Sequence, residues 1–280
     1  MSDTRPVRTI LFVPADRPDR FSKALATSAD LVCIDLEDAI AANAKDKGRQ
    51  TVSHFLSENG SSRVAVRCNS VKDLVGLRDL LMLAEVSNPP EVLVIPKVES
   101  FEEVQLVAGA FEGTKTQLVP AIETPSAVAH ASQIARAPRC LAMAFGGGDL
   151  SACLGIAMSW EALLFSRSAV VQACSRAQVS AWDVPYLDLA DDKGLGEETV
   201  RAKALGFSAK IALHPRQLEV IQSAFQVSDE QVREATEALR AFEAGGRRGF
   251  TFNGSFLDAP IMRKYQDILK ARGIPYDGVE

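Results

Sequence analysis

The sequence predicts an α/β fold, a (β/α)8 barrel followed by a C-terminal helical extension. Eight short apolar runs alternate with helical patterns between residues 9 and 225, and no long break in composition divides them. Polar residues directly follow most of these runs, where the carboxyl ends of parallel strands would lie. Alternating strands and helices form a parallel sheet with right-handed crossovers, and eight such units are enough to close a barrel.

The first four strands are expected at the apolar runs Thr9–Val13, Leu31–Asp35, Arg63–Val66 and Glu91–Ile95. Runs this short fit strands that are buried on both faces of a parallel sheet. The segments after them have helical spacing, and we expect helices up to about Ser28, over Lys45–Glu58, over Lys72–Ala84 and from Ser100.

The other four strands are expected at Gln117–Ala121, Leu141–Phe145, Val179–Trp182 and Lys210–Leu213. Thr124 and Pro125 suit the N-cap and the first turn of the helix after the fifth strand. Three glycines follow the sixth strand and predict a tight turn or a close approach of the backbone to a ligand. Later helices are expected over Trp160–Ala177, Glu197–Leu205 and Pro215–Phe225.

The tail departs from this alternation of strands and helices. Two helical patterns, Asp229–Glu243 and Ala259–Ala271, are joined by the glycine-rich segment Gly245–Gly254, which suits a mobile connector. We therefore expect residues 1–227 to form the barrel domain and residues 228–280 to form a helical extension. Because these helices have no strand partners, we expect them to pack outside the barrel or on a neighbouring subunit.

Composition and charge exclude several classes of protein. Hydrophobic residues make up 47% and charged residues 24% of the chain, as in ordinary soluble domains. The net charge of −5 and the lack of a basic run argue against a nucleic-acid partner. The first residues lack an apolar stretch long enough for a signal peptide, and no later run would span a membrane. Five scattered cysteines, none in a C-x-x-C pair, predict buried reduced thiols and a cytoplasmic location.

Two carboxylates follow consecutive strands of the predicted barrel. Glu123 follows the fifth strand, and Asp149 follows the three glycines after the sixth. Carboxylate oxygens are the ligands that hard cations prefer, so these residues predict a metal site at the carboxyl end of the barrel. Taken alone, either residue has the alternative role of a helix N-cap or a partner for an arginine.

Other polar residues are expected on the same face because they too follow strands: Arg17, Glu37, Asp38, Arg67, Lys97 and His214. A lysine at the end of a barrel strand can form a Schiff base, which makes Lys97 an alternative to a metal as the electrophile. His214 precedes a proline and is expected to fix its loop by hydrogen bonding rather than to act as a base. A doubly wound open sheet is the alternative fold, but it requires a glycine-rich phosphate turn after the first strand, and the segment PADRP is not one.

Short motifs along essentially the whole chain resemble one family. They are TILFVPADRPDRFSKAL, DLEDA, Arg67-x-Asn69, IPKVES, AIET, FGGGDL, ALGFSAKIALHPRQ and FNGSFLDAP. Each motif alone is weakly specific, but their combination and order are specific. The chain resembles the citrate lyase β-subunit-like branch of the HpcH/HpaI aldolase family.

The resemblance implies a TIM barrel that uses Mg2+, or Mn2+ in its place, for reversible carbon–carbon cleavage. The implied substrate is a 3-hydroxyacyl-CoA thioester of the citramalyl-CoA or malyl-CoA type, and the implied products are acetyl-CoA and a 2-oxo acid. In that family the residues matching Glu123 and Asp149 hold the metal, and the arginine matching Arg67 contacts the substrate. A fixed positive charge at Arg67 would stabilise the developing enolate oxygen.

Further site residues are expected around this centre. Glu37 and Asp38 would orient Arg67 or water on the metal, and Arg17 would bind the substrate carboxylate or the CoA. The resemblance also implies a homo-oligomer, a trimer or a hexamer. In it, Asp258 of the GS-x-x-D-x-P motif would reach over a neighbouring subunit's barrel and take part in acid–base chemistry. A plain N-cap of the last helix is the alternative role for Asp258.

Four alternative functions stay open at the level of sequence. They are the β subunit of a citrate lyase complex acting on a citryl thioester, a class II aldolase of free 2-oxo acids, a malyl-CoA thioesterase, and a catalytically silent barrel that serves as a scaffold. The intact set Glu123, Asp149 and Arg67 argues against the silent barrel.

Overall fold

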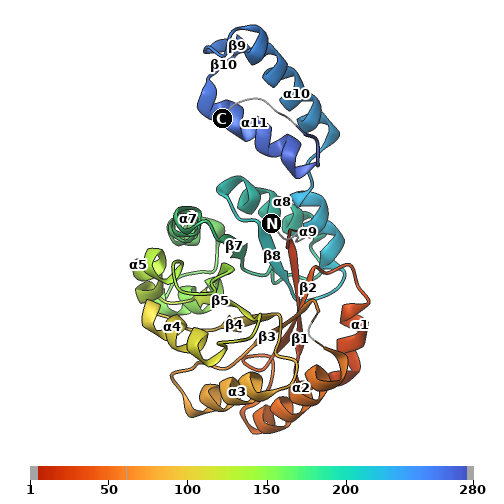
Figure 1. Cartoon of the computed structure of the whole chain (residues 1–280), viewed down its shortest axis with the longest axis vertical. Coiled ribbons are helices and arrows are strands. Elements are labelled where there is room, and N and C mark those ends of the chain that lie inside the picture. Colours follow the sequence, from red (N-terminus) through yellow and green to blue (C-terminus); the bar gives the residue numbers. More distant parts are fainter. Residues whose placement is uncertain (1–5, 61, 276–280) are drawn as a thin grey trace. The chain divides into compact units, whose positions relative to one another are not determined.

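The computed structural model describes residues 6–60 and 62–275, and the chain divides into two compact units, Met1–Phe225 and Gln226–Glu280. The first unit is a closed barrel of eight parallel strands in sequential order, so the predicted (β/α)8 barrel is confirmed (Figure 1). The strands are β1 (Thr9–Pro14), β2 (Leu31–Asp35), β3 (Val64–Arg67), β4 (Val92–Ile95), β5 (Gln117–Ile122), β6 (Ala142–Phe145), β7 (Ser180–Asp183) and β8 (Ala209–Ala212).

Helices follow the strands in alternation. They are η1 (Pro18–Arg20), α1 (Phe21–Leu25), η2 (Ala42–Ala44), α2 (Lys45–Asn59), α3 (Leu74–Glu85), α4 (Phe101–Ala110), α5 (Pro125–Ile134), α6 (Gly147–Leu154), α7 (Trp160–Ala177), α8 (Asp192–Leu205) and α9 (Gln217–Phe225). Thr124 caps α5 as predicted, because its side chain accepts a hydrogen bond from the Ala127 backbone. Helix α8 begins before the predicted Glu197 because the Asp191 side chain caps it by accepting from the Gly194 backbone.

The sequence did not predict α6. The glycines after β6 do not form a separate turn: Gly146 is the N-cap, and Gly147 already lies in the helix. Glycine disfavours a helix by about 1 kcal/mol relative to alanine, which is why the pattern predicted a turn. Close packing accounts for the glycine at this helical position, because a Cβ on Gly147 would lie 3.1 Å from the side chains of both Leu163 and Phe145.

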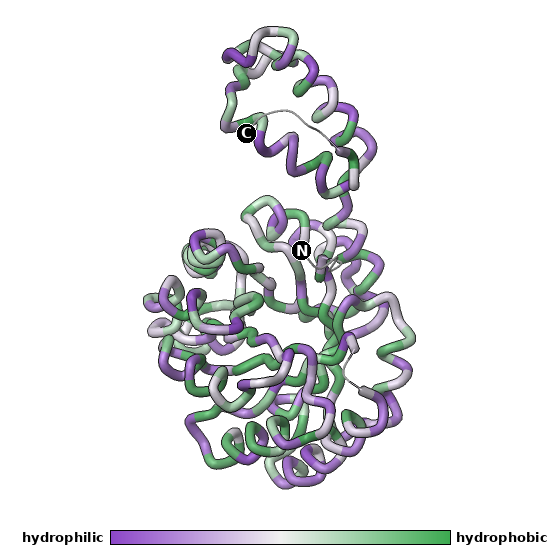
Figure 2. The backbone as a smooth tube through the Cα atoms, in the orientation of Figure 1, coloured by the Kyte–Doolittle hydropathy of each residue, from purple (hydrophilic) through white to green (hydrophobic). Residues whose placement is uncertain are grey.

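Alternate residues of each strand fill the barrel interior, and the residues between them pack against the helices. On β4, Val92 and Val94 point inward whereas Leu93 packs outward. Figure 2 shows hydrophobic residues along the strands and mixed hydropathy on the helices around them. Ala121 and Ala144 are small interior residues at the ends of β5 and β6, and they leave room for a cavity.

Four charged side chains between the barrel and its helices form a buried network. Lys210 Nζ lies 2.6 Å from Asp183 Oδ2 and 2.8 Å from Glu198 Oε1. Arg167 Nε lies 3.1 Å from Asp183 Oδ1, and its guanidinium stacks on the Phe145 ring. The side chains of Lys210, Asp183 and Arg167 are at most 2% exposed. Because buried charges need partners, this network ties α7 and α8 to β7 and β8.

The second unit contains α10 (Asp229–Ala244), an antiparallel hairpin of β9 (Phe250–Phe252) and β10 (Ser255–Leu257), and α11 (Ala259–Ala271). It has an apolar cluster of its own, which includes Phe242 and Leu257. The prediction of a mobile connector at Gly245–Gly254 is wrong for residues 250–254, which form the first strand and the turn of the hairpin. Asn253 and Gly254 make its turn with φ of 48° and 78°, and Asn-Gly is a favoured pair for such turns.

The structure also bears on the expectations for membrane-spanning segments and for the cysteines. No helix in residues 6–60 and 62–275 is long and apolar enough to cross a membrane. All five cysteines are unpaired, and Cys33, Cys68 and Cys174 are buried as predicted. Cys153 is exposed, contrary to the prediction, because it lies on the outer side of the helix that the sequence did not reveal.

Candidate active site

A cavity of about 190 Å3 opens at the carboxyl end of the barrel, on the face where the polar residues were expected. Arg67 at the end of β3, Glu123 after β5 and Asp149 in α6 all line it. The structure thus brings together three predicted site residues that are far apart in sequence, because the ends of parallel barrel strands converge.

Glu123 is only 4% exposed. Its Oε2 accepts a hydrogen bond of 2.7 Å from the backbone N–H of Lys97. Lys97 has a left-handed φ of 56°, an uncommon conformation for a residue with a side chain, and in it the N–H meets the carboxylate. Burial, followed by the negative charge of Glu37, raises the pKa of Glu123 to about 7.

Gly146 makes room for Glu123. A Cβ on Gly146 would lie 2.1 Å from Cγ and 2.8 Å from Oε1 of Glu123. Its φ of −97° is open to any residue, so the requirement for glycine is steric and not conformational. The close approach predicted from the glycines is therefore one between the backbone and a site side chain.

Arg67 is held by two carboxylates, one of which was not predicted. Its Nε and Nη2 bind the two oxygens of Asp35 at 2.7 and 2.6 Å, and its Nη1 lies 3.0 Å from Glu37 Oε2. Burial disfavours the charge on Arg67, but Asp35 and Glu37 outweigh it and raise the pKa above its ordinary value. Asp35 was taken only as the end of a strand, although its spacing of two from Glu37 places both side chains on one side of the chain.

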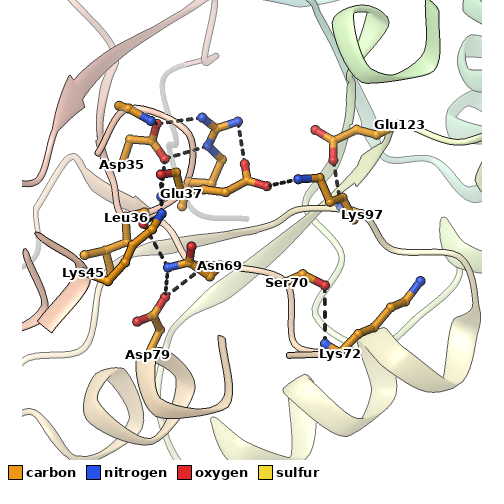
Figure 3. Close-up of polar contacts among 12 residues, drawn as sticks. Asp35, Leu36, Glu37, Lys45, Asn69, Ser70, Lys72, Asp79, Lys97 and Glu123 are labelled. Atoms are coloured by element: carbon orange, nitrogen blue, oxygen red, sulfur yellow. Dashed lines mark hydrogen bonds and ion pairs between the residues drawn. The ribbon is translucent and has the colours of Figure 1, made fainter. Parts of the chain in front are cut away.

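Glu37 bridges Arg67 and Lys97, and Figure 3 shows its pair with Lys97. Its Oε1 lies 2.9 Å from Lys97 Nζ, yet neither of its buried oxygens accepts a hydrogen bond of good geometry. Burial raises the pKa of Glu37, and the two cations act against that rise. Burial also lowers the pKa of Lys97, but Glu37 outweighs it, so the net shift is upward. The ion pair with Glu37 and this upward shift disfavour the neutral amine that a Schiff base needs.

The backbone that carries Glu37 is fixed by two neighbours (Figure 3). Asn69 Nδ2 donates to the Leu36 carbonyl at 2.9 Å and to Asp79 Oδ2 at 2.6 Å. Lys45 Nζ donates to the carbonyls of Leu36 and Glu37. The two polar residues of the Arg-x-Asn motif therefore act together. Arg67 lines the cavity, and Asn69 fixes the segment whose Glu37 side chain holds Arg67 in place.

Other predicted residues are placed differently. Asp38 is exposed and makes no hydrogen bond or ion pair with the described residues, so Glu37 and not Asp38 orients the site arginine. Arg17 does not line the cavity and pairs with Asp19 at 3.0 Å on the surface. His214 Nδ1 accepts from the Arg216 backbone at 3.2 Å, in agreement with a loop-fixing role.

Asp258 belongs to the second unit. It is the N-cap of α11 by position, and its carbonyl accepts from the backbone of Ile261 and Met262. Its side chain makes no capping hydrogen bond. The carboxylate therefore does not perform the simple capping role that was the alternative to a catalytic one.

The donor set of the cavity fits a hard divalent cation. Asp149 is half-buried and makes no hydrogen bond or ion pair with the described residues, and Glu123 uses only Oε2 within them. No group of three or more His, Cys, Asp or Glu in the described part of the chain is placed to hold a metal. Mg2+ commonly takes one or two carboxylates and completes its octahedron with water and substrate oxygens, so Glu123 and Asp149 suit it.

The raised pKa of Glu123 predicts an unusual dependence of stability on pH in EDTA. Between its ordinary pKa of 4.5 and about 7, the folded state keeps a proton that the unfolded state has lost. Glu123 should therefore lower the free energy of unfolding as pH rises through this window, by on the order of 3 kcal/mol. Glu123→Gln should remove this component, which denaturant unfolding of both proteins from pH 4.5 to 8 would measure. Parallel pH profiles would contradict the assignment.

The active sites of (β/α)8-barrel enzymes lie at the carboxyl end of the barrel, where this chain has its carboxylate-lined cavity. Residues 8–215 match the HpcH/HpaI aldolase/citrate lyase family. Human mitochondrial citramalyl-CoA lyase is 31% identical over 94% of this chain and 84% of its own length. Citrate lyase subunit beta of Haemophilus influenzae is 30% identical over 94% of this chain and 96% of its own length.

Solved structures are similar over nearly the whole chain. Protein CitE from Mycobacterium tuberculosis, in complex with magnesium, acetoacetate and coenzyme A, matches with a TM-score of 0.84 at 30% identity. The match covers 96% of this chain and 98% of that one. The chain belongs to the HpcH/HpaI aldolase/citrate lyase family and is a carbon–carbon lyase.

Proposed function

We propose that this enzyme is a Mg2+-dependent lyase that cleaves a 3-hydroxyacyl-CoA thioester of the citramalyl-CoA or malyl-CoA type to acetyl-CoA and a 2-oxo acid. The observation that carries the proposal is the single cavity shared by Glu123, Asp149 and Arg67. Glu123 and Asp149 would hold Mg2+, or Mn2+ with the same oxygen ligands. The scattered, unpaired cysteines support a cytoplasmic location for the enzyme.

When bound, the cation would supply a Lewis acid and a template for the 2-oxo acid. In the cleavage, the 3-hydroxyl loses its proton, the bond between C2 and C3 breaks, and the electron pair passes to the thioester as an enolate. Arg67 donates two of its five N–H groups to Asp35, and its Nη1 forms an ion pair with Glu37. The other N–H groups would be left for the enolate oxygen or the substrate. Protonation of the enolate carbon then gives acetyl-CoA. Glu37 and Asp35 keep Arg67 charged and in place throughout.

A panel of thioesters tests this proposal. Citramalyl-CoA, malyl-CoA, a citryl thioester and a CoA-free hydroxy-2-oxo acid are each incubated with Mg2+, with Mn2+ or with EDTA, and the released 2-oxo acid and free CoA are measured. We expect 2-oxo acid with intact acetyl-CoA from one of the first two, and none in EDTA. Preference for the citryl thioester would indicate a citrate lyase β subunit. Release of free CoA would indicate a thioesterase, and cleavage of CoA-free substrates would indicate a class II aldolase. Full activity in EDTA would overturn the proposal.

We further propose that the enzyme is a homo-oligomer, a trimer or a hexamer, in which Asp258 serves acid–base chemistry in a neighbouring subunit's site. The absence of a capping hydrogen bond from the Asp258 side chain supports a role for its carboxylate outside its own helix.

Mixing two inactive variants tests the role of Asp258 in trans. Asp149→Ala removes a metal ligand, and Asp258→Ala removes the proposed acid–base group. If the two residues meet across subunits, hybrid oligomers contain some sites with both residues intact, and activity should return after subunit exchange. A monomer in sedimentation experiments, or no recovery after proven exchange, would contradict the proposal.

A further inference from the structure

Two neighbouring segments form one side of the active-site cavity. The β7–α8 segment, residues 184–191, contributes Val184, Pro185 and Leu187 to the wall, and the β8–α9 segment, residues 213–216, contributes Leu213. Val184 is buried, whereas Leu187 and Leu213 are exposed, so this wall runs from the interior to the mouth. Both segments lie outside the barrel strands, so bonds other than strand pairing must hold the wall in place.

The side chain of Gln217 joins these two segments. Gln217 is the first residue of α9 and is only 1% exposed. Its Oε1 accepts hydrogen bonds from the backbone N–H groups of Leu213 at 2.8 Å and His214 at 3.3 Å. Its Nε2 donates to the Tyr186 carbonyl at 3.0 Å. The first two bonds stay next to α9, and the third crosses to the β7–α8 segment.

Tyr186 is held at its side chain as well as at its carbonyl. Its hydroxyl donates to Asp191 Oδ2 at 2.7 Å, and Asp191 Oδ1 accepts from the Gly194 backbone at 2.8 Å. A Cβ on Gly194 would overlap both the tyrosine hydroxyl and the carboxylate, so this arrangement requires glycine there. A second link across the wall, between Arg216 and Asp192 at 3.4 Å, is exposed, and exposed ion pairs contribute little. The buried amide is therefore the stronger connection.

We propose that Gln217 is a positioning residue for the cleavage reaction: it holds the β7–α8 segment against the β8–α9 segment, so that the wall aligns the substrate with Arg67 and the metal ligands. The inference rests on the proposed function, because it assigns this wall to the substrate of that reaction. A simpler role is helix capping, since a glutamine three residues after His214 can accept from its backbone N–H. Capping uses Oε1 alone, whereas positioning needs Nε2.

Gln217→Glu separates the two roles. The new carboxylate accepts from the same two backbone N–H groups, which favour its ionised form, but it has no proton to donate to the Tyr186 carbonyl. We expect kcat/KM for citramalyl-CoA or malyl-CoA to fall about 10-fold to 100-fold, mostly in kcat, because a misplacement of about 1 Å costs such a factor. The Kd for Mg2+, measured by calorimetry, should stay within about twofold of the wild type, because the bonds of Gln217 do not reach Glu123 or Asp149.

Gln222→Glu is the matched control. Gln222 lies on the same helix, and its amide likewise accepts from Ser28 Oγ at 3.3 Å and donates to the Ser28 carbonyl at 2.7 Å. Ser28 precedes β2 and so lies at the amino end of the barrel, away from the cavity. This variant should keep the kcat, the KM and the Mg2+ affinity of the wild type.

A second variant keeps the test decisive if the buried carboxylate of Gln217→Glu prevents folding. Gln217→Met has a similar volume and brings in no charge, and it too lacks the donor for Tyr186. Both variants should bind one Mg2+ per chain. Both should also show faster amide hydrogen exchange than the wild type in residues 186–195, because the segment that carries Tyr186 has lost its link to α9.

The outcomes separate this inference from the proposed function. A fall in kcat/KM in the Gln217 variants, with Mg2+ binding intact and Gln222→Glu unaffected, would support the inference. Wild-type kinetics in Gln217→Glu would overturn it and reduce Gln217 to a helix cap in a working lyase. Loss of Mg2+ affinity in parallel with activity would also overturn it, because Gln217 would then support the whole site. Failure of the wild type to cleave either thioester would overturn the proposed function, and amide exchange would still show whether Gln217 holds the segment.

Discussion

Gly146→Ala should strongly weaken Mg2+ binding and cleavage although it changes no proposed ligand. The new Cβ would lie 2.1 Å from Cγ of Glu123, so the glutamate must leave its place. Alanine is compatible with the backbone at this position, because φ is −97°. We expect kcat/KM to fall by at least about 100-fold, the usual effect of moving a reacting group by about 1 Å. Calorimetry with Mg2+ and a thioester assay would measure both losses.

Gly148→Ala is the control for this prediction. Gly148 lies two residues further along the same glycine run, and a Cβ there would meet nothing within 4 Å. This variant should bind Mg2+ as the wild type does, because it leaves Glu123 undisturbed. Unchanged Mg2+ affinity in Gly146→Ala, with the fold intact by circular dichroism, would remove Glu123 from the metal site.

Arg67→Lys should lower kcat by about 100-fold to 1,000-fold while Mg2+ binding persists. Lysine keeps the charge, but it cannot bind both oxygens of Asp35 and also approach Glu37, as the planar guanidinium does at 2.7, 2.6 and 3.0 Å. Asp35 and Glu37 would lose a partner, and the developing enolate would lose donors fixed in advance. Steady-state kinetics with Mg2+ titration would separate the fall in kcat from any change in metal affinity.

Arg201→Lys is the matched control for Arg67→Lys. Arg201 is a surface arginine that pairs with Glu161 and stacks on Trp160, and it does not line the cavity. Its replacement should leave kcat unchanged. An unchanged kcat in Arg67→Lys as well would make Arg67 a structural residue.

The barrel and the residues at its strand ends could be predicted from the sequence because both depend on short-range patterns. A buried strand needs an apolar run, and the next residue along the chain then lies at the barrel's rim. For this reason we expected Arg67, Glu123 and Asp149 on one face of the barrel, and all three line one cavity in the structure. Asp35 was missed, and the close approach predicted from the glycines was not assigned to Gly146 and Glu123. Both contacts run between strands, and a residue's neighbours in sequence do not reveal them.

The direction of side chains in loops was the other feature that the sequence could not predict. Asp38 follows its strand as Glu37 does, but the backbone held by Asn69 and Lys45 presents only Glu37 to Arg67. Arg17 has an acidic neighbour two residues away and pairs with it. The hairpin of the second unit had a signal in sequence, the Asn-Gly pair at 253–254, and its neighbouring glycines obscured it.

The buried charges of Lys210, Asp183 and Arg167 restrict how this chain can evolve. Loss of Asp183 leaves Arg167 buried without an ion-pair partner, which destabilises a protein by roughly 3–5 kcal/mol, whereas replacing a whole set with well-packed apolar residues is often neutral. Since the free energy of unfolding of a domain is only about 5–15 kcal/mol, a single substitution of this kind would remove a large part of the stability. Descendants of this sequence should exchange these positions together or keep them all, and mutagenesis one site at a time would never reach the apolar alternative.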